Sequence, residues 1–216
     1  MTRLLAILLS AAPLPALAHP HIFIDTGLEI MLDEAGALTQ VKITWTYDEY
    51  YSLLITQDLR IDQDFDGVLT SQDRERLTGF DMNWVEGYNG DLVARLDGIP
   101  LDLSGPQDPT ATLQDGRITT THVRTVAGTP DLSGRVLSLF AYDETYYSAY
   151  EISLPVRILP SSVCALDKIA PDIDNELEQM RQMLLTINAD ADLEENDIPL
   201  IGARFATEIR VSCPDS

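Results

Sequence analysis

Residues 22–45 read IFIDTGLEIMLDEAGALTQVKITW and predict how the fold begins. Apolar and polar residues alternate from Ile22 to Met31 and again from Val41 to Trp45, which is the two-residue period of a strand with one buried face. Between them, residues 33–36, DEAG, carry the residue types of a tight turn. The stretch therefore predicts an antiparallel hairpin at the start of a β-rich domain.

Further short strands follow and are separated by turn residues. We expect them at residues 92–96, 99–103, 117–126, 135–142, 147–154 and 205–211. Gly105-Pro106 and Asp108-Pro109 predict a loop, and apolar residues at helical spacing predict a helix from Ile173 to Ile187. The predicted fold class is α+β, a β-rich sandwich-like domain with a C-terminal helix.

Residues 62–73, DQDFDGVLTSQD, form the most specific chemical motif of the chain. Aspartates stand at loop positions one, three, five and twelve, and Gly67 stands at position six, which is the pattern of an EF-hand calcium loop. Its flanks have helical patterns, so we expect an EF-hand-like helix–loop–helix inserted at about residues 49–81. The predicted ligands are Asp62, Asp64, Asp66, the Val68 carbonyl, Thr70 and Asp73.

The last position of this loop departs from the usual pattern. Asp73 stands where most EF-hands have a glutamate, and its shorter side chain chelates less well with both oxygens. We therefore expect a weak Ca²⁺ site, with Mg²⁺ as the alternative ion. A single such loop favours a structural ion over a calcium sensor.

The first eighteen residues have the layout of a cleaved secretory signal peptide. Arg3 precedes a short apolar run, and residues 16–18, ALA, form a small-x-small cleavage site. The apolar run is shorter than a membrane-spanning helix requires. We expect an exported, periplasmic protein, a single domain of residues 19–216 without stable membrane insertion.

The charge and the cysteines agree with export. The formal net charge is −21, which opposes binding to nucleic acid and to anionic lipid. Cys164 and Cys213 are the two cysteines of the sequence. In an oxidising compartment such a pair most simply forms one disulfide.

The three histidines of the chain provide a second functional signal. Cleavage after Ala18 would leave His19-Pro20-His21 at the N-terminus, where the α-amine adds a nitrogen ligand to two imidazoles. Pro20 lacks the N–H that the square-planar N-terminal copper and nickel site requires. We expect a site for Zn²⁺, or for Ni²⁺ or Cu²⁺, completed by His122 or by a carboxylate; the alternative is that the histidines are incidental.

The sequence also resembles a known bacterial family. The opening AHPHIFID (residues 18–25), the acidic loop, the segment YDETYY (residues 142–147) and the ending from Phe205 to Cys213 are similar to exported proteins labelled as the periplasmic component of an uncharacterised ABC-type transport system. The resemblance implies a nickel/cobalt-type membrane permease as partner and a link to zinc acquisition. It also draws attention to Asp143 as a metal ligand or as a hydrogen-bond acceptor for an imidazole.

The sequence gives little support to an enzyme. It contains no G-x-S-x-G, H-E-x-x-H, P-loop or G-x-G-x-x-G motif. One enzymatic alternative is a copper monooxygenase, which also uses an N-terminal histidine. We expect a non-enzymatic periplasmic accessory protein that binds a divalent transition metal, with a structural calcium loop; the competing hypothesis is a calcium-stabilised structural or interaction module.

Overall fold

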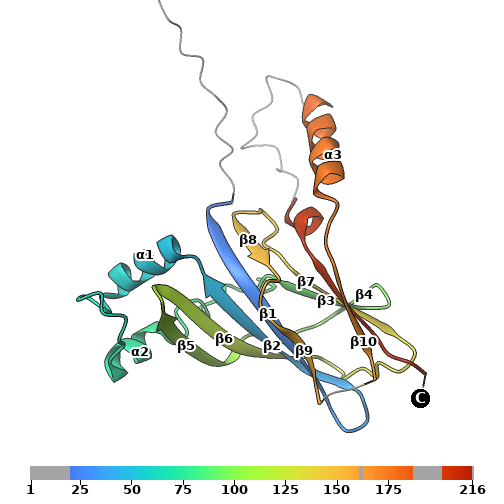
Figure 1. Ribbon diagram of the computed structural model, residues 1–216. Helices are drawn as coiled ribbons and strands as arrows, with labels where there is room; N and C mark the ends of the chain where they lie inside the picture. The colour runs from blue at the N-terminus through green and yellow to red at the C-terminus, as the bar shows by residue number, and fades with distance from the viewer. Residues whose placement is uncertain (1–19, 161–162, 187–200, 216) are drawn as a thin grey trace, which may run out of the picture.

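The computed structural model describes residues 20–160, 163–186 and 201–215, and these residues form two β-sheets whose buried faces share one hydrophobic core (Figure 1). The first sheet has the order β5-β6-β2-β1-β8, with β9 also paired to β1. Its strands are β1 (Ile22–Leu32), β2 (Leu38–Tyr47), β5 (Gln107–Gln114), β6 (Arg117–Thr125), β8 (Ser148–Glu151) and β9 (Val156–Leu159).

The second sheet has the order β10-β11-β7-β3-β4. Its strands are β3 (Leu92–Leu96), β4 (Ile99–Leu101), β7 (Val136–Ala141), β10 (Ala165–Ile169) and β11 (Glu208–Ser212). The helices are α1 (Glu49–Leu59), α2 (Ser71–Leu77), α3 (Ile173–Thr186) and the 3-10 helix η1 (Gly202–Phe205). The prediction of an α+β fold with a C-terminal helix is confirmed.

The predicted N-terminal hairpin forms the centre of the first sheet. β1 and β2 pair in antiparallel register from Ile24 opposite Tyr47 to Leu32 opposite Leu38. The other edge of β1 pairs in parallel with β8 and then with β9. Gly27 lies at the break between these two strands, where a Cβ atom would come within 2.9 Å of the Leu154 Cβ. A larger residue at this position would therefore push the β8–β9 connection away.

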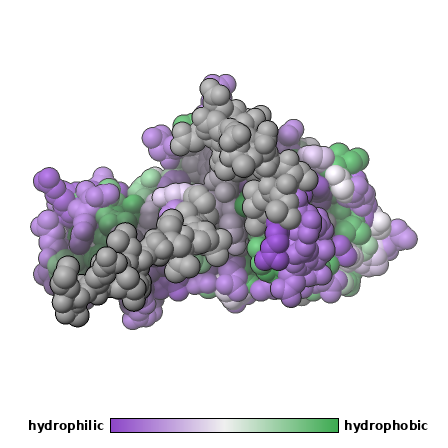
Figure 2. All heavy atoms as spheres, turned by 90° about the horizontal axis from the view of Figure 1, so that it is seen from above, coloured by the Kyte–Doolittle hydropathy of each residue, from purple (hydrophilic) through white to green (hydrophobic). Residues whose placement is uncertain are grey.

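Alternate residues of both sheets build the core. On the first sheet Leu28 and Ile43 are almost fully buried, and on the second sheet Leu139 and Ile209 are too. Burial of a side chain of this size contributes about 1.5 to 3 kcal/mol. The outer faces are polar, and hydrophilic residues cover much of the molecule when it is seen from above (Figure 2), as the net charge of −21 requires.

The helix pair α1 and α2 lies beside the β5 and β6 end of the first sheet (Figure 1). Asp48 caps the start of α1: its side chain accepts a hydrogen bond from the Tyr51 N–H at 2.8 Å. The Ser52 hydroxyl of the same helix accepts the Ile118 N–H of β6 at 2.9 Å. The helix pair is thus attached to the sheet through a buried hydrogen bond.

A disulfide between Cys164 and Cys213 joins the start of β10 to the end of β11, which confirms the predicted pairing. It closes a loop that contains α3 and η1, and such a closure stabilises the fold mainly by restricting the unfolded chain. Within the described residues, no helix combines the length and the apolar character needed to cross a membrane.

Several strand predictions were wrong in part; the last predicted strand, 205–211, begins only at Glu208, because Phe205 belongs to η1. Residues 107–114 form β5 where we expected a loop; the register shifts between Gln107 and Thr110, and Pro109 is tolerated because β5 is an edge strand. The expected strand 147–154 ends at Glu151, since the chain bends past Gly27 before β9 begins. β9 has only four residues and β10 is exposed at four of its five positions, so periodicity did not reveal these strands.

Candidate metal centre

The acidic loop brings three carboxylates together. One oxygen atom each from Asp62, Asp64 and Asp66 lies within 4.8 Å of the others. The Gly67 N–H donates to Asp62 Oδ1 at 3.0 Å, and the Val68 N–H donates to Asp66 Oδ1 at 2.7 Å. Within residues 20–160, 163–186 and 201–215, no other group of three or more His, Cys, Asp or Glu side chains is placed this closely.

Local backbone geometry and two buried side chains hold this loop in place. Gly67 has a φ of 75°, which glycine adopts without strain and which makes the sharp turn at the sixth position. Ile61 precedes the loop and Leu69 is its eighth residue; both are buried in the core. The loop is therefore anchored at both ends while its carboxylates face solvent.

Asp73 and Thr70 form a capping box at the start of α2. Asp73 Oδ2 accepts hydrogen bonds from the Thr70 N–H at 3.1 Å and from its hydroxyl at 2.7 Å. The hydrogen bond from the Thr70 side chain is the main cause of the lowered pKa of Asp73. Because Oδ2 is held in this way, Oδ1 is the oxygen that remains for a cation, so Asp73 would bind with one oxygen only.

His21 lies exposed at the start of β1, at the other end of α1 from the acidic loop. Its ring lies 4.9 Å from the Tyr147 ring, and its backbone N–H donates to the Tyr147 carbonyl at 2.8 Å. Glu49 lines the same surface hollow as His21. Asp48 also lines it, but its two carboxylate oxygens already accept backbone N–H groups. His19 lies outside the described residues.

Asp143 is committed to a turn. Its carboxylate accepts hydrogen bonds from the Thr145 N–H and hydroxyl at 2.8 and 2.9 Å, and from the Ser148 N–H at 3.0 Å. These bonds shape the turn that places Tyr147 beside His21. Asp143 is therefore linked to His21 only indirectly, because it holds the turn whose Tyr147 ring contacts the His21 ring.

His122 is buried in the core, with 1% of its surface exposed. Its ring lies between Trp45 and Trp84, at centroid distances of 4.7 and 5.5 Å. His122 on β6 pairs with Ile43 on β2, and Ile43 pairs with Leu28 on β1. Leu28 is seven residues along the chain from His21, a distance of about 23 Å in an extended strand. The structure does not bring His122 to His21.

β6 carries a strip of buried polar residues that periodicity did not identify. Thr120, His122 and Arg124 alternate on the inner face of β6; we name them the buried polar strip. Burial, and secondarily the charge of Arg124, lowers the pKa of His122 to about 3. The signal in the sequence was the run TTTHVRT, which is polar on both faces of one strand.

The loop from residue 78 to residue 91 covers this strip. Asp81 Oδ2 accepts hydrogen bonds from the Tyr47 and Thr120 hydroxyls, both at 2.7 Å, and burial raises the pKa of Asp81. The Arg124 guanidinium lies against the Trp84 ring and donates to the carbonyl of Ser104 at 2.7 Å. In the described part of the chain, the buried side-chain atoms without a hydrogen-bond partner all belong to this region: Trp45 Nε1, Asp81 Oδ1 and both ring nitrogens of His122.

Comparison with known proteins places the chain in a family without assigning it an activity. No curated protein matches the sequence. Residues 4–213, nearly the whole chain, match the family described as Protein of unknown function (DUF1007), and the chain belongs to that family.

Proposed function

We propose that this protein is an exported, periplasmic divalent-metal-binding accessory protein of a metal transport system, with a structural calcium loop in residues 62–73. The observation that carries the proposal is the convergence of Asp62, Asp64 and Asp66 within 4.8 Å. Three carboxylates at this spacing repel one another without a cation, and hard divalent ions prefer oxygen ligands.

The ion in this loop would be Ca²⁺, with Mg²⁺ as the weaker alternative. Asp62, Asp64 and Asp66 would bind through carboxylate oxygens, Val68 through its carbonyl, and Thr70 and Asp73 at the far side of the loop. Single-oxygen binding by Asp73 predicts a lower affinity than that of an EF-hand with glutamate at this position. The core contacts of Ile61 and Leu69 link ion binding to the stability of the helix pair.

The transition-metal site would be formed at the processed N-terminus. His19 and His21 would supply imidazoles, the freed α-amine a further nitrogen, and Glu49, which lines the same hollow as His21, the carboxylate that completes the set. Zn²⁺ is the favoured ion, with Ni²⁺ or Cu²⁺ as alternatives. By the family resemblance, the recipient or donor of this metal is a membrane permease, and no catalytic step is required of the protein.

The calcium loop is tested by thermal unfolding of metal-free protein with and without Ca²⁺. At a concentration of one hundred times Kd, a ligand of the folded state adds about 2.7 kcal/mol, so Tm should rise with Ca²⁺ concentration. Asp64→Asn should abolish the rise, while Asp167→Asn, an equal charge change on exposed β10, should retain it. An unchanged Tm in Ca²⁺ would refute the loop assignment.

The transition-metal site is tested by titrating Zn²⁺ and Ni²⁺ into protein processed to begin at His19. Binding should be lost in the His19→Ala/His21→Ala double variant and weakened in Glu49→Gln. His122→Phe should bind as the parent protein does, because His122 is buried far from His21. Unprocessed protein that begins at Met1 controls for the α-amine. Undiminished binding in the double variant would favour the alternative of a calcium-stabilised structural module.

A further inference from the structure

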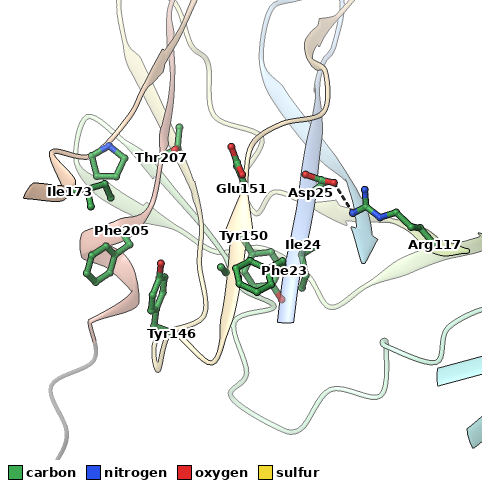
Figure 3. A pocket seen from close by; sticks show the side chains of 12 residues that line it. Phe23, Ile24, Asp25, Arg117, Tyr146, Tyr150, Glu151, Ile173, Phe205 and Thr207 are labelled. Atoms are coloured by element: carbon green, nitrogen blue, oxygen red, sulfur yellow. Dashed lines mark hydrogen bonds and ion pairs between the residues drawn. The ribbon is translucent and has the colours of Figure 1, made fainter. Parts of the chain in front are cut away.

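A pocket of about 360 Å³ lies at the end of the molecule where β1 begins (Figure 3). One side is formed by β1 and β8 of the first sheet. The opposite side is formed by the segment that leads into α3 and by the end of η1, both attached to the second sheet. The pocket therefore opens along the edge strand β8, between the two sheets.

Aromatic and aliphatic side chains form its walls. Tyr146 and Phe205 stack with their ring centroids 4.7 Å apart and their planes 28° apart. Figure 3 shows these two rings and Ile173 on one side, and Phe23 and Glu151 on the other. Phe23 is 55% exposed, although it belongs to the central strand β1. The pocket thus presents apolar rings to solvent on two sides.

The Tyr146–Phe205 ring pair is held in place by the chain around it. Tyr146 has a φ of 61°, a left-handed conformation that costs a non-glycine residue about 1 to 2 kcal/mol. The Tyr146 N–H donates to the Asp143 carbonyl at 3.0 Å, and the Gly202 N–H donates to the Glu144 carbonyl at 3.0 Å. A Cβ atom on Gly202 would overlap the Asp143 carbonyl oxygen. Close packing of this turn on η1 therefore fixes the rings before any ligand arrives.

The charges in the pocket leave one carboxylate unpaired. Arg117 and Asp25 form an ion pair at 2.7 Å, and the Ser153 hydroxyl also donates to Asp25. Glu151 forms no ion pair with any residue that the structure describes. The pocket thus carries a local negative charge on a chain whose net charge is −21. This field attracts cations and opposes anionic ligands.

We propose that this pocket binds a lysine or arginine side chain from an extended segment of a partner protein. Aromatic faces attract a cationic head group, the ring walls accommodate its aliphatic stem, and Glu151 supplies the opposite charge. The edge strand β8 runs along the pocket and gives an extended backbone room to lie beside it. The partner surface is therefore basic, complementary to this acidic protein. The inference does not depend on either metal site.

Fluorescence anisotropy with labelled five-residue peptides tests the proposal. The peptides carry a central arginine, lysine, glutamine or glutamate between isoleucines, and EDTA is present so that no metal contributes. The arginine and lysine peptides should bind saturably, with affinity that falls as salt rises. Glu151→Gln and Phe205→Leu should each weaken binding by about 3- to 30-fold.

Glu34→Gln is the matched control, since it removes the same charge from the turn at the far end of β1. It should bind the peptides as the parent protein does, and the Tm of each variant reports whether it is folded. Three results would overturn the proposal. The glutamate peptide could bind as tightly as the arginine peptide, both pocket variants could keep the affinity of the parent protein, or no peptide could bind saturably at millimolar concentration. Competition by free arginine as strong as that of the peptide would overturn the assignment to a protein segment.

Discussion

The acidic loop and the buried polar strip are both short polar runs, yet they are built in opposite ways. The loop keeps its carboxylates at the surface, and its hydrogen bonds join residues no more than five positions apart. The strip turns inward, and the residues of its network come from distant positions, with Asp81 bonded to Tyr47 and Thr120. Regular spacing thus predicts a site when the site is local, and it fails when the partners are far apart in the chain.

The two regions also differ in what a change should cost. Solvent surrounds the loop and can replace a lost contact, so substitutions there should mainly alter cation binding. Water has little access to the strip, so a lost or added group leaves an unsatisfied atom or a steric overlap. Four substitutions test this difference.

Gly90→Ala should have the largest effect. Gly90 has a φ of 69°, and a Cβ atom there would overlap the Trp84 ring that covers the strip. Backbone strain of about 1 to 2 kcal/mol and overpacking of about 1 to 3 kcal/mol predict a loss of about 4 kcal/mol in unfolding free energy by urea denaturation. Gly87→Ala, at a φ of 85° with open space around it, isolates the strain and should lose about 1 kcal/mol. Equal losses in the two variants would contradict the overlap.

Asp81→Ala should be the next most destabilising. It removes the acceptor of two hydroxyl hydrogen bonds at 2.7 Å, and each unsatisfied partner costs about 1 to 3 kcal/mol. We expect a loss of about 3 kcal/mol in the free energy of unfolding. Asp81→Asn keeps an acceptor oxygen and should lose much less. A small loss in Asp81→Ala would show that Tyr47 and Thr120 find other partners.

His122→Phe should change the pH dependence of stability. The pKa of His122 is lowered to about 3 in the folded state, so between pH 6.5 and 3 the unfolded chain binds the extra proton. Acidification in this window therefore destabilises the parent protein, by up to about 1.4 kcal/mol per pH unit. Relative to the parent, the phenylalanine variant should gain about 2 kcal/mol at pH 5 compared with pH 7.

Two carboxyl groups beside the strip act in the opposite sense. The pKa values of Asp81 and Asp91 are raised mainly by burial, so their stabilising contribution is present at low pH and is lost as pH rises through the folded-state pKa. Both remain in the His122→Phe variant, and the difference between the two proteins therefore isolates His122. Parallel stability curves from pH 4 to pH 7 would contradict its burial as a neutral group.

Gly67→Ala should have the smallest effect on metal-free protein. No atom lies within 4 Å of a Cβ built at this position, so the cost is the strain of a φ of 75°, about 1 kcal/mol. Its effect on Ca²⁺ binding should be larger, because the sharp turn positions the neighbouring ligands. A metal-free loss as large as that of Gly90→Ala would erase the difference between the two regions.

The strength of each sequence pattern explains which predictions succeeded. Alternation in Ile22–Met31 and Val41–Trp45 extends over many residues, and the hairpin forms as expected. The pairing of Cys164 with Cys213 followed from their number. β5 contains Pro109 and a bulge, and β9 has only four residues, so neither showed a clear period. The signal peptide, the calcium and transition-metal ions and the permease remain predictions.

The sequence by itself determined the α+β class, the central hairpin, the disulfide and the spacing of Asp62, Asp64 and Asp66, because each depends on local periodicity or residue count. Only the tertiary structure decided that His122 is buried far from His21, that Asp143 shapes a turn, and that Phe23, Tyr146 and Phe205 meet around one pocket. Those relations arise from the register of strands and the packing of two sheets, which bring together residues far apart in the chain.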